Sequence, residues 1–155
     1  MTDLSDLIDR DTILGSLKAN SKKKVLQDIA APAARRTGLA ERQIFETVLQ
    51  RERLGSTGVG NGIAIPHGKL AGVERLMGVF ARLENPVDFD AIDGEPVDLV
   101  FLLLAPENAG ADHLKALSRI ARTLRDPVRV ERLRATSDED ALLAVLADPG
   151  RNKAA

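Results

Sequence analysis

Residues 97–104 (VDLVFLLL) constrain the fold of this chain more than any other stretch, because every residue after Asp98 is apolar. An uninterrupted apolar run of this length is typical of a β-strand that is covered on both faces of its sheet. Pro106 should end the run, since proline removes a backbone donor from a strand ladder. Helices must then cover the sheet, so the run predicts an α/β protein.

Strands are predicted to be interleaved with helices along the rest of the chain. Residues 76–83 fit a strand that Asn85 and Pro86 should break. The other predicted strands are residues 12–17 and 63–65, and the main predicted helices are residues 22–37, 41–53 and 113–125. This order predicts an α/β sandwich, with residues 1–150 forming a single domain and residues 151–155 a disordered tail.

Helix ends can be predicted from the residues that satisfy free backbone groups. Ser21 is the expected N-cap of the first helix and Gly38 its end. Pro32 lies inside this helix, where the loss of a backbone donor should kink it. Asp112 is the expected N-cap of the helix over residues 113–125.

The composition excludes several classes of function. The chain has 155 residues and a net charge of −1, which argues against broad attraction to nucleic acid or anionic lipid. It has no cysteine, and its two histidines form no HExxH pattern, so no metal site is expected. The acidic start is unlike a signal peptide, and the longest apolar run is too short to cross a membrane. A soluble cytoplasmic protein is therefore expected, with no nucleic-acid partner and no membrane insertion.

The segment with the clearest functional signal is residues 55–69 (GSTGVGNGIAIPHGK), which contains five glycines. Glycine lets backbone N–H groups turn inward around an anion. The segment is not a Walker A loop, because the first glycine of that motif would fall on Ile63 and Leu70 replaces its Ser or Thr. It is not a dinucleotide fingerprint either, since the third glycine would fall on Ile63 or Ile65.

His67 is the candidate reactive residue of this segment. Pro66 before it restricts the backbone, and a neutral imidazole is a good nucleophile for phosphorus near pH 7. Arg51 lies in the last turn of the preceding predicted helix, where its forked donors suit a phosphate. His113 lies 46 residues after His67 (113 − 67). Spacing alone slightly favours a solvent-exposed His113 over a ring that donates a hydrogen bond to a phosphoryl group on His67.

Two blocks of sequence carry a family resemblance that covers nearly the whole chain. Residues 51–69 (RERLGSTGVGNGIAIPHGK) and 99–126 (LVFLLLAPENAGADHLKALSRIARTLRD) resemble the IIA proteins of the bacterial phosphoenolpyruvate-dependent phosphotransferase system, fructose–mannitol type. The resemblance implies a three-layer sandwich in which helices flank both faces of a mixed β-sheet. It implies that His67 accepts a phosphoryl group from a phosphohistidine on a small carrier protein similar to the general phosphocarrier. By the same resemblance His113 stabilises that group, Arg51 lines the site, and no metal or organic cofactor takes part.

Asn61 departs from the sugar-carrying members of the family, which often have an acid there. This difference favours the regulatory branch, whose members control partner proteins in nitrogen or potassium metabolism according to their phosphorylation state. The residues expected to hold the phosphate are Arg51, Ser56, Thr57, Gly60 and Asn61. Two alternatives stay open: a sugar-transport IIA subunit that passes its phosphate to a IIB partner, and a binding module that holds an anion without catalysis. The regulated targets, the active phosphorylation state, the oligomeric state and the reactive imidazole nitrogen also stay open.

Overall fold

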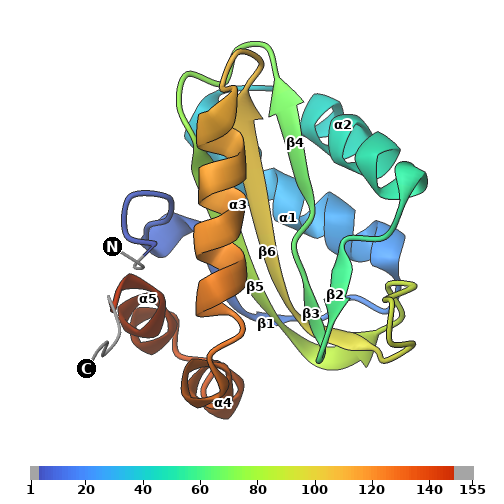
Figure 1. Cartoon of the computed structure of the whole chain (residues 1–155), viewed down its shortest axis with the longest axis vertical. Helices are drawn as coiled ribbons and strands as arrows, with labels where there is room; N and C mark the ends of the chain where they lie inside the picture. Colours follow the sequence, from blue (N-terminus) through green and yellow to red (C-terminus); the bar gives the residue numbers. More distant parts are fainter. Residues whose placement is uncertain (1–3, 149–155) are drawn as a thin grey trace.

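The computed structural model describes residues 4–148 of the chain (Figure 1). These residues form a six-stranded mixed sheet in the order β1-β5-β6-β3-β2, with β4 also paired to β6. The strands are β1 (Ile13–Leu17), β2 (Gly58–Gly60), β3 (Ile63–Ala64), β4 (His67–Leu70), β5 (Met77–Val87) and β6 (Val97–Pro106). The predicted tail, residues 151–155, lies outside the described residues.

Strand β6 is the centre of the sheet, as the apolar run predicted. It pairs with β5 in antiparallel fashion and with β3 and β4 in parallel fashion. Residues 99–105 of β6 have no exposed surface. Leu99, Phe101 and Leu103 pack on one face of the sheet, while Val100, Leu102 and Leu104 pack on the other. A strand with both faces buried needs apolar residues at every position, which explains the lack of alternation.

Helices cover both faces of the sheet, so the predicted three-layer sandwich is confirmed. The helices α1 (Lys22–Thr37) and α2 (Glu41–Leu54) pack on one face. The opposite face is covered by α3 (Ala111–Thr123), α4 (Pro127–Ala135) and α5 (Glu139–Ala147). A 3-10 turn, η1 (Arg10–Thr12), leads into β1. Figure 1 shows α3 in front of the sheet and α1 and α2 behind it. No helix among residues 4–148 is long and apolar enough to cross a membrane.

Helix α1 begins and ends where the sequence predicted. The Ser21 side chain accepts a hydrogen bond from the backbone of Lys24, and Gly38 ends the helix in the left-handed conformation with φ of 80°. Pro32 does not divide the helix, which runs from Lys22 to Thr37. Pro32 is itself buried, so its ring adds to the packing of α1 while one backbone donor is lost.

Two predicted boundaries are wrong. Strand β5 continues through Asn85 and Pro86 to Val87, because its ladder with β6 is irregular between Arg82 and Val87 and needs no donor from the proline there. Helix α3 begins at Ala111 after Gly110, and Asp112 lies inside its first turn instead of capping it.

Candidate active site

The site is built where the chain crosses from β3 to β4. Both strands run parallel to β6, with Ile63 opposite Leu99 and His67 opposite Leu103. At the crossing, the carbonyl oxygen of Pro66 accepts a hydrogen bond of 3.0 Å from the backbone N–H of Leu103. The carbonyl of Ile65 is thereby left to bond with a side chain. His67 thus begins β4, a strand that is hydrogen-bonded to the central strand β6, which gives a rigid support for a reactive group.

The ring of His67 is oriented by a backbone carbonyl. Its Nδ1 lies 2.9 Å from the oxygen of Ile65. Because a carbonyl oxygen can only accept a hydrogen bond, Nδ1 must carry the proton, and the lone pair of the neutral ring is then on Nε2. Burial lowers the pKa of His67 from its ordinary value of 6.5, and the charge of Arg51 lowers it further, while the Ile65 bond and the charge of Glu52 raise it. The ring is therefore neutral near pH 7.

His113 lies beside His67, on the third residue of α3. The two ring centroids are 5.4 Å apart, with the ring planes inclined by 53°. The expectation that His113 is exposed is wrong, since only 8% of its surface is accessible. Its Nε2 is buried and has no hydrogen-bond partner among residues 4–148. Burial lowers the pKa of His113, and positive charge at His67 and at Lys69 lowers it further.

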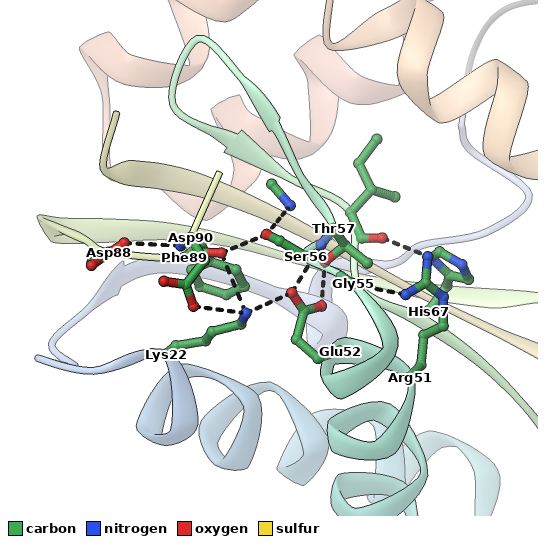
Figure 2. Close-up of polar contacts among 12 residues, drawn as sticks. Lys22, Arg51, Glu52, Gly55, Ser56, Thr57, His67, Asp88, Phe89 and Asp90 are labelled. Carbon is green, nitrogen blue, oxygen red and sulfur yellow. Dashed lines mark hydrogen bonds and ion pairs between the residues drawn. The ribbon is translucent and has the colours of Figure 1, made fainter. Parts of the chain in front are cut away.

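Arg51 reaches the site from the last turn of α2. Its Nη1 donates a hydrogen bond of 2.9 Å to the carbonyl of Gly55, which occupies one of the five guanidinium donors. Figure 2 shows the side chain rising from the helix end toward the His67 ring. Arg51 is close enough to lower the pKa of His67, and His113 contacts the same ring, so the three side chains form one cluster.

In the glycine-rich segment, residues 55–69, the hydroxyl groups of Ser56 and Thr57 donate hydrogen bonds to other groups of the protein. Ser56 donates its hydroxyl hydrogen to the carbonyl of Phe89. Thr57 donates its backbone N–H to Glu52 over 2.8 Å and its hydroxyl to the same carboxylate over 2.5 Å. Since a hydroxyl has one hydrogen to donate, neither side chain has a donor left for a phosphate in this arrangement.

The structure does not bring Gly60 and Asn61 to His67. They lie at the tip of the β2–β3 hairpin, whose turn has positive φ angles at Asn61 (58°) and Gly62 (80°). The carbonyl of Asn61 accepts a hydrogen bond from Arg134 over 2.6 Å. Along β6, the start of β3 and His67 are four residues apart, a distance of about 13 Å in a strand. The sequence predicted that residues 55–69 form one continuous anion-binding loop. Part of this segment is instead a hairpin that is directed away from His67.

Sequence reasoning missed Glu52, a buried acid next to Arg51. The signal was present, because Ile44, Val48 and Glu52 follow the helical spacing i, i+4, i+8 and all three are buried in α2. A charged residue on an apolar stripe needs partners, and those of Glu52 are Thr57 and Lys22. Figure 2 shows this network beside His67.

The described residues hold no cluster of three or more His, Cys, Asp or Glu side chains that could bind a metal ion. The donors gathered here are one guanidinium and two imidazoles, which are groups that bind and exchange a phosphoryl group.

Comparisons with known proteins agree over almost the full chain. The family model described as "Phosphoenolpyruvate-dependent sugar phosphotransferase system, EIIA 2" matches residues 6–148. A nitrogen regulatory protein of Bradyrhizobium diazoefficiens is 60% identical over 146 residues, which are 94% of this chain and 95% of that protein. The crystal structure of nitrogen regulatory protein IIA-Ntr from Neisseria meningitidis matches with a TM-score of 0.87 and 39% identity, covering 92% of this chain and 97% of that one. The crystal structure of IIA mannitol from Escherichia coli matches with a TM-score of 0.76 and 26% identity, covering 90% and 99%.

Proposed function

The chain belongs to the EIIA 2 family of the phosphoenolpyruvate-dependent sugar phosphotransferase system, and we propose that it is a cytoplasmic regulator that carries a phosphoryl group on His67. The donor is the phosphohistidine of a small carrier protein of the same system. The state of His67 then decides which partner proteins are bound. Similarity to nitrogen regulatory proteins at up to 60% identity supports the regulatory branch over the transport branch.

One observation carries the proposal: the hydrogen bond from His67 Nδ1 to the carbonyl of Ile65. It holds the ring in the tautomer whose Nε2 has a free lone pair, and the lowered pKa keeps that lone pair unprotonated near pH 7. A histidine that only filled space in a loop would need neither a fixed tautomer nor an unpaired nitrogen. We therefore assign Nε2 as the atom that accepts the phosphoryl group.

The transfer exchanges one nitrogen–phosphorus bond for another. The Nε2 lone pair of His67 forms a bond to phosphorus while the bond between phosphorus and the donor imidazole breaks, and the bonding electron pair returns to the donor nitrogen. The transition state is loose, so the protein contributes mainly position and charge. Arg51 would supply a positive charge and a hydrogen-bond donor, and His113, through Nε2–H, a second donor.

Phosphorylation would change the surface that partners meet. A phosphoryl group brings about two negative charges to a half-buried site. Leu54, at the end of α2, and Leu114, beside His113, are large apolar side chains with 85% and 67% of their surface exposed. A partner that packs on these side chains would have to desolvate the new charge, so its affinity would depend on the phosphorylation state.

A transport IIA subunit is the second candidate, favoured by the family description, which names sugar transfer, and by the similarity to IIA mannitol. The chemistry at His67 would be the same, but the phosphate would pass to a IIB protein. Supplying candidate IIB proteins to the phosphorylated chain separates the two, since a transport subunit would empty its label onto one of them and a regulator would keep it.

The test of the proposal is labelling with radioactive phosphoenolpyruvate, the first enzyme of the system and its carrier protein. The wild-type chain should take up one acid-labile phosphate, with phosphorus bonded to Nε2 as read by 31P NMR. His67→Ala should fold normally and take up none. Normal labelling of that variant would show that another residue accepts the phosphate, and failure of the wild type to label would favour an anion-binding module.

A further inference from the structure

Glu52 occupies a costly place for an acid. Its side chain is 2% exposed and lies in the last turn of α2. The helix dipole is negative at that end, so it disfavours a carboxylate there, and burial removes the water that would otherwise stabilise the charge. Hydrophobic packing alone would favour an apolar residue at this position of the buried stripe. We therefore expect the carboxylate of Glu52 to make specific hydrogen bonds that an apolar side chain could not make.

Both carboxylate oxygens of Glu52 hold the start of the glycine-rich segment. Oε2 accepts the backbone N–H of Thr57 over 2.8 Å, and Oε1 accepts its hydroxyl over 2.5 Å. Two bonds to one residue fix the position of that residue and the direction of its peptide group. Thr57 is thus bound to the end of α2 by its side chain and its main chain together.

From Thr57 an unbroken series of hydrogen bonds leads to the reactive ring. The carbonyl of Thr57 accepts the backbone N–H of Ile65 over 2.9 Å. The carbonyl of the same Ile65 accepts Nδ1–H of His67, also over 2.9 Å. Glu52 therefore reaches His67 through two residues, and the last link is the bond that selects the tautomer. Figure 2 shows Glu52, Thr57 and His67 in this order.

Lys22 anchors the other side of the carboxylate. Its Nζ lies 2.9 Å from Oε2 of Glu52 and donates a hydrogen bond of 3.3 Å to the carbonyl of Phe89. The ammonium group also lies 5.3 Å from the centre of the Phe89 ring. Lys22 is the first residue of α1, so it joins that helix, the end of α2 and the loop after β5 around one buried charge.

We propose that Glu52, with Lys22 as its counter-ion, is a positioning residue that fixes the tautomer of His67 through Thr57 and Ile65. This inference rests on the proposed function for its effect on phosphoryl transfer, but the tautomer itself is a property of the unphosphorylated chain. Thr57, which sequence reasoning assigned to the phosphate, acts in this account as the link between the carboxylate and the ring.

The test compares Glu52→Gln with the wild type in two measurements. Glutamine has nearly the same shape but only one acceptor oxygen, so it cannot accept both Thr57 donors and the lysine. In the unphosphorylated protein, 15N NMR of the His67 ring should show a shift from Nδ1–H toward a mixture of tautomers. Labelling by the phosphorylated carrier should slow by about 10- to 100-fold, the range expected when a reacting group is misplaced by roughly 1 Å.

Three further variants make the result specific. Thr57→Val removes the hydroxyl link and should shift the tautomer in the same direction, whereas Thr57→Ser keeps the link and should behave as wild type. Glu46→Gln is the matched control, because Glu46 lies on the same helix but is exposed and paired with Arg42. If Glu52→Gln does not fold, Thr57→Val decides alone.

Folded Glu52→Gln or Thr57→Val protein with a wild-type tautomer and labelling rate would overturn the inference. A wild type that takes up no label but whose tautomer responds to Glu52→Gln would overturn the proposed function and leave the positioning role standing. The two failures are thus distinguishable.

Discussion

The rings of His67 and His113 lie next to each other, with centroids 5.4 Å apart and planes inclined by 53°, although one lies on a strand and the other on a helix 46 residues later (113 − 67). Within residues 4–148 the buried Nε2 of His113 has no partner. An unpaired buried polar group costs about 1–3 kcal/mol. An oxygen of a phosphoryl group on His67 would supply the missing partner, so this cost would be recovered when the group arrives.

Replacing His113 should therefore slow phosphorylation without changing the His67 tautomer. We expect His113→Ala to lower the rate of labelling by the phosphorylated carrier by about 100-fold, the typical cost of losing one donor to a developing negative charge. His113→Gln, which keeps an N–H donor, should lose less. Single-turnover labelling measures both variants, and a wild-type rate for His113→Ala would rule out a role for this ring.

Arg51 should need its guanidinium geometry as well as its charge. One of its donors is bonded to Gly55, and the remaining donors can bind a phosphoryl oxygen at the same time. A charge-assisted hydrogen bond contributes about 1.5–3 kcal/mol, so Arg51→Gln should label about 10- to 100-fold more slowly, with Arg51→Lys in between. Arg53→Gln, on the exposed side of the same turn, is the control. Equal rates for Arg51→Lys and the wild type would show that charge alone is sufficient.

Stability should fall in mild acid because of the two histidines. Both have a pKa below 6.5 in the folded chain, mainly through burial. Between the folded and unfolded pKa values the unfolded chain binds more protons, so stability is fully present above pH 6.5 and falls as the pH drops through this window. The lowered pKa of Asp93 acts only below about pH 4, because its ordinary value is 3.8. Urea unfolding of wild type and His67→Asn/His113→Asn between pH 7 and 5 measures the effect, and the double variant should lose less stability. Parallel pH profiles would contradict the lowered pKa values.

Two glycines should differ in how strongly their replacement by alanine changes stability. A Cβ on Gly78 of β5 would lie 2.4 Å from a ring carbon of buried Phe101, so Gly78→Ala should destabilise the fold by about 1–3 kcal/mol. A Cβ on Gly55 would meet nothing within 4 Å, and its φ of 163° is extended backbone. Thermal unfolding should show a clear drop for the first variant and little change for the second. A large drop for Gly55→Ala would mean that its backbone needs glycine after all.

Much of the fold follows from local sequence because its signals agree with one another. Three signals each predict a single local structure, and the structure confirms all three: the apolar run of β6, the N-cap at Ser21 and the helix end at Gly38. The prediction that Pro86 ends the strand was wrong because the effect of a proline depends on the partner strand. A proline breaks a regular ladder of hydrogen bonds, but the ladder between β5 and β6 is irregular at that point. Sequence alone does not show where a neighbouring strand stops pairing.

The candidate site was harder to predict because helix phase and loop direction are set by packing. In α3 the structure buries Ala116 and Ile120, while the apolar side chain of Leu114 is exposed. His113 lies on the same buried side of α3, although its spacing in the sequence had favoured an exposed position. The Asn61-Gly62 pair is typical of a two-residue hairpin turn, which the interpretation of residues 55–69 as an anion-binding segment did not include. Arg51 and His67 were predicted from residue type, and they lie close together because α2 ends beside the start of β4.

Arg51 and Glu52 are neighbours in α2, yet Arg51 is directed toward the His67 ring and Glu52 into the protein, since successive helical residues project about 100° apart. Inserting or deleting a single amino acid shortly before this pair would rotate both out of place at once. Length changes among homologues should therefore be rejected in the part of α2 that precedes Arg51.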